Sequence, residues 1–276
     1  MEKLEEIALD IRRSIFKTVY HNRAGHLASC LSSVEILVAL YFGGVMKYNT
    51  ANPNMADRDR LILSKGHVAL AIYHVLAKAG YFDAKEVSTF CKEGTFFGGL
   101  TTYGKIPGIE TTTGSLGHGL SFAAGVAMMG QSDRCKYNVY TLIGDGELQE
   151  GEIWEAAMFI INHKLTNHTI IIDNNGIQAT GYGKDIINLE DIAQKWEAFG
   201  FSVIEVDGHS IPALLESIHK RTDKPKVIIA NTIKGKGLSF AENKGDWHYK
   251  MPSEEEVTQG LLDLDMTREE LSNYEK

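Results

Sequence analysis

The alternation of apolar runs with helical runs in the second half of the chain constrains its fold most. Within residues 139–175, the β-rich runs "VYTLIG" and "HTIIID" flank a segment at 150–163 that has helical periodicity. The alternation continues with a helical run at 190–199, then "FSVIEV", a helical run at 211–220, and "KVIIANT". Buried strands that alternate with helices form parallel sheets covered on both faces. We therefore predict an α/β fold, a parallel sheet flanked by helices.

The first half of the chain is predicted to be mostly helical. Residues 4–20 and 68–79 have helical periodicity, and between them "SSVEILVALYF" places Ser32 and Glu35 at the spacing of a capping box. The stretch "EGTFFGGLTTYGKIPGIETTTGSLGHG" at 93–119 is predicted to be a loop. Long ordered loops are more often functional than idle, so this loop is expected to serve a site.

Length and composition favour one large domain. The chain has 276 residues, of which 43% are hydrophobic, and no Pro- or Ser-rich linker interrupts the pattern. The last residues, beginning "MPSEEEV", are rich in glutamate and are predicted to be helical. The predicted division is a domain at 1–250 and a helical tail at 251–276.

Charge and targeting signals exclude several classes of protein. A net charge of -8 with scattered Lys and Arg argues against a nucleic-acid partner. The N-terminus, "MEKLEEIALDIRRS", lacks the pattern of a secretory signal, and no apolar stretch is long enough to span a bilayer. We therefore expect a cytoplasmic protein. Its cysteines, Cys30, Cys91 and Cys135, are odd in number and far apart, so they are predicted to be reduced, buried hydrophobic residues.

Two of the predicted strands end in side chains that could share a metal ion. Asp145 lies in "IGDGE" and Asn175 lies in "IDNNG", and both would emerge at one edge of a parallel sheet. Carboxylate and amide oxygens suit Mg²⁺ or Ca²⁺, and Gly144 and Gly146 let a phosphate approach the backbone. The helix that begins near Glu150 favours an anion at its N-terminus. Each pattern alone is also common as a turn, but the pair predicts a diphosphate held through a divalent metal.

At these residues the sequence resembles thiamine-diphosphate enzymes, whose cofactor motif is GDG followed about thirty residues later by NN. The run "GDGELQEGEIWEA" resembles the transketolase form of this motif. Further segments agree in the transketolase order: "AGHLAS" at 24–29, "DRLILSKGH" at 59–67, "TTGSLGHG" at 112–119, "TIKGKG" at 232–237 and "DWH" at 246–248. The resemblance covers residues 21–248 and implies a thiamine-diphosphate-binding fold.

The resemblance covers only the first half of a full-length transketolase. The pyrimidine-binding domain, which activates the cofactor, has no counterpart in the chain. The sequence therefore resembles the N-terminal subunit of a split transketolase, which needs a separate partner, the C-terminal subunit. Family precedent implies two copies of each subunit in a heterotetramer. Glu155 matches a glutamate that links two cofactor sites across the dimer, although a solvated carboxylate on a helix face is an equal alternative.

The resemblance also assigns site residues. It implies that Mg²⁺, or Ca²⁺ or Mn²⁺ in its place, is bound by Asp145, Asn175 and the backbone carbonyl of Ile177. It assigns contacts with thiamine diphosphate to Ser29, His67, Gly114, Ser115, Leu116, Gly146 and Lys234. His26 and His248 match histidines beside the reacting carbons, and histidine suits proton transfer near neutrality. Core or surface positions are expected for the histidines at 21, 74, 163, 168, 209 and 219.

Three residues depart from the transketolase pattern. A loop histidine that contacts the donor sugar in the family is replaced by Leu100, which cannot hydrogen-bond a hydroxyl. His118 stands where glutamine is usual, and Tyr249 stands where glycine is usual. Our hypothesis is a transketolase that transfers a two-carbon ketol unit from a ketose, or a ketose phosphate, to an aldose. We expect its substrate range to be altered, for example toward a branched or modified sugar.

Other functions remain as alternatives. One is half of an enzyme like 1-deoxyxylulose-5-phosphate synthase, although "LQEG" after GDG favours the transketolase branch. A 2-oxo acid dehydrogenase component fits "SKGH" and "DWH" less well. The alternative of another class is a non-catalytic scaffold protein. Intact Asp145, Asn175 and Ile177 argue against it, because a scaffold needs no metal site.

Overall fold

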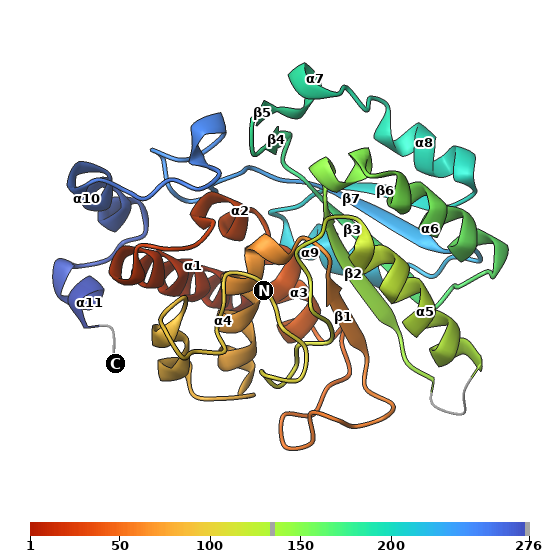
Figure 1. Cartoon of the computed structure of the whole chain (residues 1–276), viewed down its shortest axis with the longest axis horizontal. Helices are drawn as coiled ribbons and strands as arrows, with labels where there is room; N and C mark the ends of the chain where they lie inside the picture. The colour runs from red at the N-terminus through yellow and green to blue at the C-terminus, as the bar shows by residue number, and fades with distance from the viewer. Residues whose placement is uncertain (133–135, 274–276) are drawn as a thin grey trace.

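A five-stranded parallel sheet forms the centre of the molecule (Figure 1). The structure is a computed structural model that describes residues 1–132 and 136–273. The strand order is β1-β2-β3-β7-β6, and every neighbouring pair is parallel. The strands are β1 (Arg60–Leu63), β2 (Val139–Gly144), β3 (His168–Asn174), β6 (Ser202–Asp207) and β7 (Lys226–Asn231). The predicted α/β fold with a parallel sheet is confirmed.

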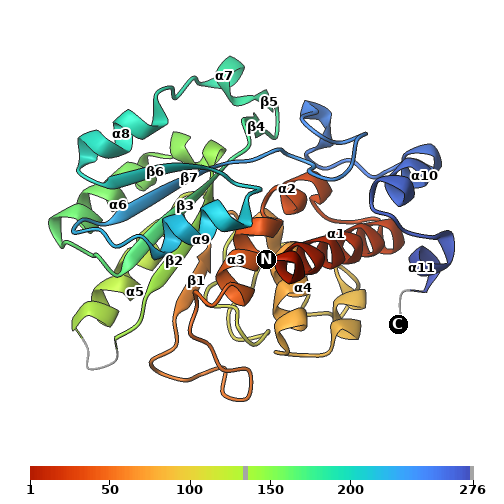
Figure 2. The same cartoon turned by 180° about the vertical axis from the view of Figure 1, so that it is seen from behind.

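Helices lie on both faces of the sheet (Figure 1; Figure 2). They are α1 (Glu2–Asn22), α2 (Leu27–Ser32), α3 (Val34–Phe42), α4 (Ala69–Ala79), α5 (His118–Ser132), α6 (Gly151–Asn162), α7 (Gly183–Ile186), α8 (Ile192–Phe199), α9 (Ile211–His219), α10 (Glu254–Asp263) and α11 (Arg268–Ser272). Short 3₁₀ helices are η1 (Gly66–Val68), η2 (Ala84–Thr89), η3 (Asp145–Gln149) and η4 (Gly245–Trp247). A small antiparallel pair is formed by β4 (Ile177–Gln178) and β5 (Gly181–Tyr182).

The strand side chains alternate between two hydrophobic cores. On β3, Ile171 joins the core shared with α1, α3, α4 and α9, whereas Ile170 and Ile172 join the core shared with α5, α6 and α8. Successive strand residues point to opposite faces, so a strand covered on both sides must be apolar throughout. This double burial explains why β2, β3 and β7, the central strands, appear in the sequence as mainly apolar runs.

Most predicted helices and strands match the structure to within a few residues, but β1 and α5 were not predicted. Strand β1 has only four residues and begins with an arginine. Helix α5 contains Gly119, Gly125 and Gly130, which weaken its helical pattern. Two of these glycines are required by close packing: a Cβ at Gly119 would lie 2.5 Å from the Ser64 side chain, and one at Gly130 would lie 2.6 Å from Tyr137. Tertiary packing therefore overrides local propensity in α5.

The predicted capping box is wrong. Ser32 is the last residue of α2, and its hydroxyl donates to Asp173 Oδ2 at 2.6 Å. Helix α3 begins at Val34 without a side-chain cap hydrogen bond. The Glu35 carboxylate accepts instead from Arg12 and His209. Burial of both residues gives them tertiary partners, which compete with local capping.

The cysteine prediction holds for one residue. Cys30 is buried, and burial raises the pKa of its thiol to about 12. Cys91 is exposed, which contradicts the predicted burial, because it follows η2 in a surface turn with a left-handed backbone. Cys135 lies outside the described residues.

The C-terminal helices lie beside α1 (Figure 1). The Arg13 side chain on α1 donates to the carbonyl of Leu264 at 2.8 Å, and Leu261 joins the core that contains α1. Within residues 1–132 and 136–273, no helix is long and apolar enough to cross a membrane.

Candidate functional site

A cavity of about 410 Å³ opens at the carboxyl ends of β2 and β3. Of the predicted site residues, those that line it are His26, Ser29, His67, Gly114, Leu116, Asp145, Gly146, Asn175, Ile177, Lys234 and His248. Ser115, which was also predicted, does not line it. Residues from seven separate segments of the sequence therefore meet in one place, and their individual roles stay predictions.

The predicted metal ligands lie on two neighbouring strand ends. Gly144 on β2 pairs with Asp173 on β3, so Asp145 and the segment after Asn174 emerge side by side. Asp145 Oδ2 accepts from the backbone N–H of Gly176 at 2.5 Å, the residue between Asn175 and Ile177. This bond ties the Gly-Asp-Gly turn directly to the segment that carries the other two predicted ligands.

The oxygen donors of this wall fit a hard divalent cation. They are one carboxylate, one amide and one backbone carbonyl, the ligand types that Mg²⁺ and Ca²⁺ prefer. The Ile177 carbonyl already accepts from the Lys234 ammonium group at 2.9 Å, so it faces positive charge. In the described part of the chain, no cluster of three or more His, Cys, Asp or Glu side chains is placed to hold a metal. The predicted set contains only one such side chain.

Buried charge surrounds Asp145. Burial and then the nearby charge of Asp173 raise the pKa of Asp145 to about 6. Burial and then the nearby charge of Lys65 lower the pKa of Lys234 to about 8. A divalent cation beside Asp145 and an anion beside Lys234 would each favour the charged form of its neighbour. The electrostatics of the cavity therefore also fit a metal with a diphosphate.

Three histidines and a tyrosine cluster at the cavity. The ring centroid of His26 lies 5.1 Å from that of His248 and 5.4 Å from that of His67, and Tyr249 packs edge-on at 4.8 Å. Burial first, and then Lys234, lowers the pKa values of His26 and His248 to about 4. The pKa of His67 is also well below its usual value, mainly because the ring is buried. All three rings are therefore uncharged at neutral pH.

Two of these histidines have distinct hydrogen-bonding states. His248 Nδ1 lies 3.1 Å from the Lys234 ammonium nitrogen, which donates to it. His26 Nδ1 is buried and has no hydrogen-bond partner among the described residues. An unpartnered buried nitrogen is costly unless something binds there. His26 therefore has hydrogen-bonding capacity that a ligand could use.

Three buried side chains at the site were missed from the sequence. Lys65 and Asp173 form an ion pair with side chains that are 1% and 0% exposed. Burial raises the pKa of Asp173, but the charge of Lys65 and several hydrogen bonds outweigh burial and hold this pKa at about 2. The Glu147 carboxylate accepts from Gly144 N–H, Gly117 N–H and the Ser64 hydroxyl. Lys65 within "SKGH" and Glu147 within "GDGE" were visible signals, but their partners are distant in sequence.

The three residues that depart from the transketolase pattern lie in different places. Leu100 lines the cavity, and a Cβ at Gly114 would lie 2.8 Å from its Cδ1 atom. Tyr249 is largely exposed beside His26. His118, the first residue of α5, does not line the cavity, and its Nδ1 lies 2.9 Å from the carboxylate of Glu152 on α6. Leu100 and Tyr249 are therefore the departures that can affect a ligand.

The remaining predicted residues lie away from the cavity. Glu155 is exposed on α6. His168 is buried and His74 is half-buried, and they form hydrogen bonds to Thr141 and Thr18, respectively. The other histidines given core or surface positions, none of which lines the cavity, are His21, His163, His209 and His219.

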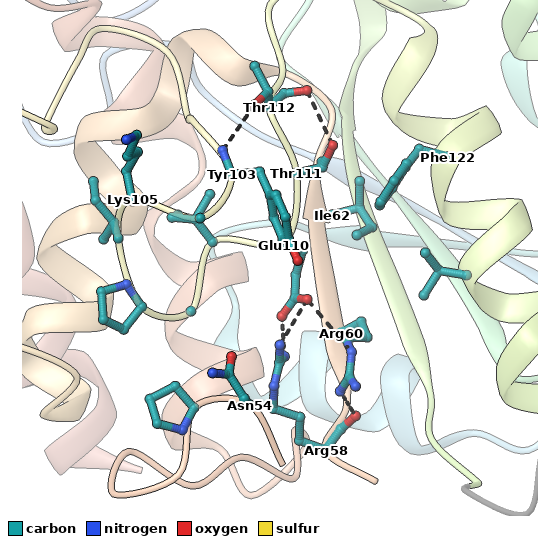
Figure 3. A pocket seen from close by; sticks show the side chains of 17 residues that line it. Asn54, Arg58, Arg60, Ile62, Tyr103, Lys105, Glu110, Thr111, Thr112 and Phe122 are labelled. Carbon is teal, nitrogen blue, oxygen red and sulfur yellow. Dashed lines mark hydrogen bonds and ion pairs between the residues drawn. The ribbon is translucent and has the colours of Figure 1, made fainter. Parts of the chain in front are cut away.

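A larger cavity of about 970 Å³ lies beside the amino end of β1, and none of the predicted site residues lines it. Figure 3 shows the Glu110 carboxylate between the guanidinium groups of Arg58 and Arg60. Both terminal nitrogens of Arg58 donate to Glu110, and the terminal nitrogens of Arg60 donate to backbone carbonyls. These cations are already occupied by the protein itself, so we place the functional site at the smaller cavity.

Known proteins match almost the whole chain. Residues 4–270 match the family described as transketolase, thiamine diphosphate binding domain. An apulose-4-phosphate transketolase subunit from Phocaeicola vulgatus is 36% identical over 274 residues, covering 98% of this chain and 97% of the relative. A 6-deoxy-6-sulfo-D-fructose transketolase subunit from a Clostridium species is 40% identical over 265 residues, covering 95% and 96%.

Full-length transketolases match over part of their length. The Homo sapiens transketolase is 36% identical over 251 residues, which are 91% of this chain and 40% of that protein. The crystal structure of transketolase from Campylobacter jejuni superposes with a TM-score of 0.89 at 28% identity, covering all of this chain and 46% of that one. The family match, the relatives of equal length and the shared fold agree. The chain belongs to the transketolase family and comprises its thiamine diphosphate binding domain.

Proposed function

We propose that this chain is the cofactor-binding subunit of a two-subunit transketolase. Together with a C-terminal subunit, it would transfer a two-carbon ketol unit from a ketose phosphate to an aldose. The observation that carries the proposal is the cavity itself, where Asp145, Asn175, Ile177 and Lys234 lie beside three uncharged histidines. The family match and the relatives named as transketolase subunits support it.

The residues of the cavity fit thiamine diphosphate and a divalent metal. Asp145, Asn175 and the Ile177 carbonyl would hold Mg²⁺, or Ca²⁺ or Mn²⁺ in its place. When bound, thiamine diphosphate supplies the stabilisation of the carbanion in ketol transfer. Its diphosphate would contact Ser29, His67, Gly146 and Lys234, and its rings would contact Gly114, Ser115 and Leu116. Residues 1–250 would form this cofactor domain, followed by the helical tail at 251–276.

His26 and His248 would move protons to and from sugar hydroxyls. The uncharged ring of His26, whose Nδ1 has no partner among the described residues, can accept a proton, and the uncharged ring of His248 can donate its N–H to a hydroxyl group. Lys234 donates to His248 Nδ1, which leaves Nε2 of that ring as its protonated nitrogen. His248 would thus act toward substrate as a donor through Nε2.

The partner subunit would supply the pyrimidine-binding domain. This chain spans 40% of the Homo sapiens transketolase, whereas it spans nearly all of the relatives named as subunits. Large apolar side chains are exposed on α5 and α6, namely Phe122, Met128, Met129, Met158 and Phe159. An exposed apolar face of this kind marks an interaction surface. It supports a two-plus-two heterotetramer, with Glu155 on the same helix α6 at the interface.

The substrate is proposed to be a branched or modified sugar, with or without a phosphate group. Leu100 lines the cavity and offers no hydrogen bond to a donor hydroxyl. Two relatives are named for apulose 4-phosphate and 6-deoxy-6-sulfo-D-fructose, which are unusual ketoses. A cytoplasmic location, where sugar phosphates are retained, goes with this proposal.

The test is reconstitution with the C-terminal subunit, followed by assays on a panel of ketose donors. Thiamine diphosphate binding should require Mg²⁺, and an Asp145→Asn variant should serve as the matched inactive control. Absence of Mg²⁺-dependent binding in the complex would favour a non-catalytic scaffold. Carbon dioxide release from pyruvate would indicate chemistry like that of 1-deoxyxylulose-5-phosphate synthase. Efficient turnover of xylulose 5-phosphate would contradict the altered substrate range.

A further inference from the structure

We infer that Asp173 is a positioning residue of the cofactor site, a single buried carboxylate that holds together the segments carrying the cofactor contacts. The inference rests on the proposed function, since it concerns the same cavity. Asp173 lies near the end of β3, is fully buried, and does not line the cavity itself. It would therefore act through its neighbours rather than by touching the cofactor.

Four donors from three separate segments converge on this carboxylate. Oδ2 accepts from the hydroxyls of Ser32 at 2.6 Å and Ser33 at 2.9 Å, and from the Lys65 ammonium group. Oδ1 accepts from the hydroxyl of Thr232. The donors come from the junction of α2 with α3, from the end of β1 and from the end of β7. One side chain thus links β3 to three other parts of the fold.

Each donor lies close in sequence to a predicted cofactor contact. Lys65 precedes His67 by two residues, and Thr232 precedes Lys234 by two residues. Ser32 lies one helical turn after Ser29, and its hydroxyl is 3.0 Å from the Ser29 carbonyl oxygen. Asn175 follows Asp173 itself by two residues. A displacement of the carboxylate would therefore move four contacts from different elements at once.

The linkage extends to the loop predicted to contact the thiamine rings. Gly66, between Lys65 and His67, is pressed against this loop: a Cβ there would lie 2.6 Å from Thr113 Oγ1 and 3.2 Å from Gly114 N. The position of Lys65 therefore also sets the position of Gly114.

Only an ionised carboxylate suits the centre of this network. It offers lone pairs for four donors and no hydrogen of its own, and it neutralises the buried ammonium group of Lys65. An asparagine would direct an N–H₂ group at donors and leave Lys65 without a counter-ion. Because Asp173→Asn would also destabilise the fold, the test uses variants of the residues that donate to Asp173.

Thr232→Val removes one donor and keeps the shape of the side chain. The probe is thiamine diphosphate with Mg²⁺, titrated into the full chain in complex with its partner, and Thr232→Ser is the conservative variant. We expect Thr232→Val to weaken cofactor binding about tenfold, the usual effect of losing a second-layer hydrogen bond at a metal site, and Thr232→Ser to restore it. The control is Thr141→Val on neighbouring β2, which removes a buried hydroxyl hydrogen-bonded to His168 on β3.

A second measurement needs no cofactor. Amide hydrogen exchange of the cofactor-free chain should speed up together in the segments around 29–33, 65–67 and 232–235 of Thr232→Val, and not in Thr141→Val. Faster exchange in 232–235 alone would overturn the linkage. Equal weakening of cofactor binding by both valine variants would reduce Asp173 to a general stability role and overturn the inference. Absence of binding by the wild-type complex would instead overturn the proposed function, whereas wild-type binding with an unaffected Thr232→Val would overturn the inference alone.

Discussion

Each end of β1 holds an ion pair with little exposure to solvent. The two ion pairs differ in the cavity that they lie beside. At the carboxyl end, Lys65 is paired with Asp173 beside the smaller cavity. At the amino end, Arg58 and Arg60 are paired with Glu110 beside the larger cavity. A search by volume alone would therefore choose the amino end.

The chemistry of the groups around each pair decides between the two ends. Arginine stays protonated in proteins, so neither of the two arginines at the amino end could exchange a proton near neutrality. Among the described residues, each end has one buried unpartnered nitrogen, Arg58 Nε and His26 Nδ1, so an unmade hydrogen bond alone does not distinguish them. Uncharged histidines together with metal-type oxygens occur at the carboxyl end. The comparison teaches that the chemical types of the groups, rather than cavity size, locate the site.

The largest expected effect is at the carboxyl end, with Asp145→Asn. The substitution removes the only carboxylate among the predicted metal ligands. We expect Mg²⁺-dependent affinity for thiamine diphosphate to fall by at least about 100-fold. Loss of a residue that only supports a metal ligand lowers affinity by up to about 100-fold, and loss of a ligand should lower it at least as much. Isothermal calorimetry of the reconstituted complex measures it. Unchanged affinity would remove Asp145 from the metal site.

The next effect concerns the histidines at the same end. His26→Asn and His248→Asn should each lower the rate of ketol transfer by about 100-fold, because general acid–base groups contribute on this scale. Affinity for the cofactor should change little. Steady-state kinetics of the complex gives the rate, with His219→Asn on the surface as the control. If the rate fell no more than in the control, His26 and His248 would have no role in proton transfer.

At the amino end, Glu110→Gln should lower the stability of the protein and leave its affinity for the cofactor nearly unchanged. The Glu110 carboxylate is only 10% exposed, and its loss leaves two arginines without their counter-ion. We expect the free energy of unfolding to fall by about 3 kcal/mol, as when a buried pair is broken. Urea unfolding measures this change, and a cofactor titration should show affinity within about twofold of wild type. A large loss of cofactor affinity would show that the two ends are coupled.

The smallest expected effect concerns His168, a histidine whose pKa is lowered although it lies away from the functional site. Burial lowers the pKa of His168 to about 3, although this ring lies in the sheet and not at the cavity. When the pKa of a histidine is lower in the folded than in the unfolded state, the protein loses stability as the pH falls below the pKa of the unfolded state. Between pH 6.5 and about 3, His168 should contribute a loss of about 1.4 kcal/mol per pH unit.

His168→Gln tests this contribution through urea unfolding between pH 4.5 and 7. The variant should lose less stability on acidification than the wild type, by the equivalent of one proton. His219→Gln, at the end of α9, is the control and should keep the wild-type slope. Parallel slopes in all three proteins would mean that His168 is protonated in the folded state at these pH values.

Much of the fold could be predicted from the sequence because a strand that is buried on both faces has an apolar sequence. The runs that became β2, β3 and β7 have this character, whereas β6 lies at the edge of the sheet and is only partly buried. Strand β1 is too short for the same signal, and the glycines of α5 weaken a helix that needs them for close packing against Ser64 and Tyr137. These failures occur where tertiary contact, rather than local preference, selects the residue.

The sequence by itself determined the family and the strand-end placement of Asp145 and Asn175, because both follow from motifs whose residues are close together in the chain. Only the tertiary structure decided how those motifs are joined. Asp173, Lys65, Ser32 and Thr232 are far apart in sequence, and each has an ordinary polar side chain that local patterns leave unassigned. The same holds for Ser32 and Glu35, whose spacing predicted a cap but whose partners are distant. Hydrogen bonds and ion pairs in a core depend on distance in space, so their partners become known only when the chain is folded.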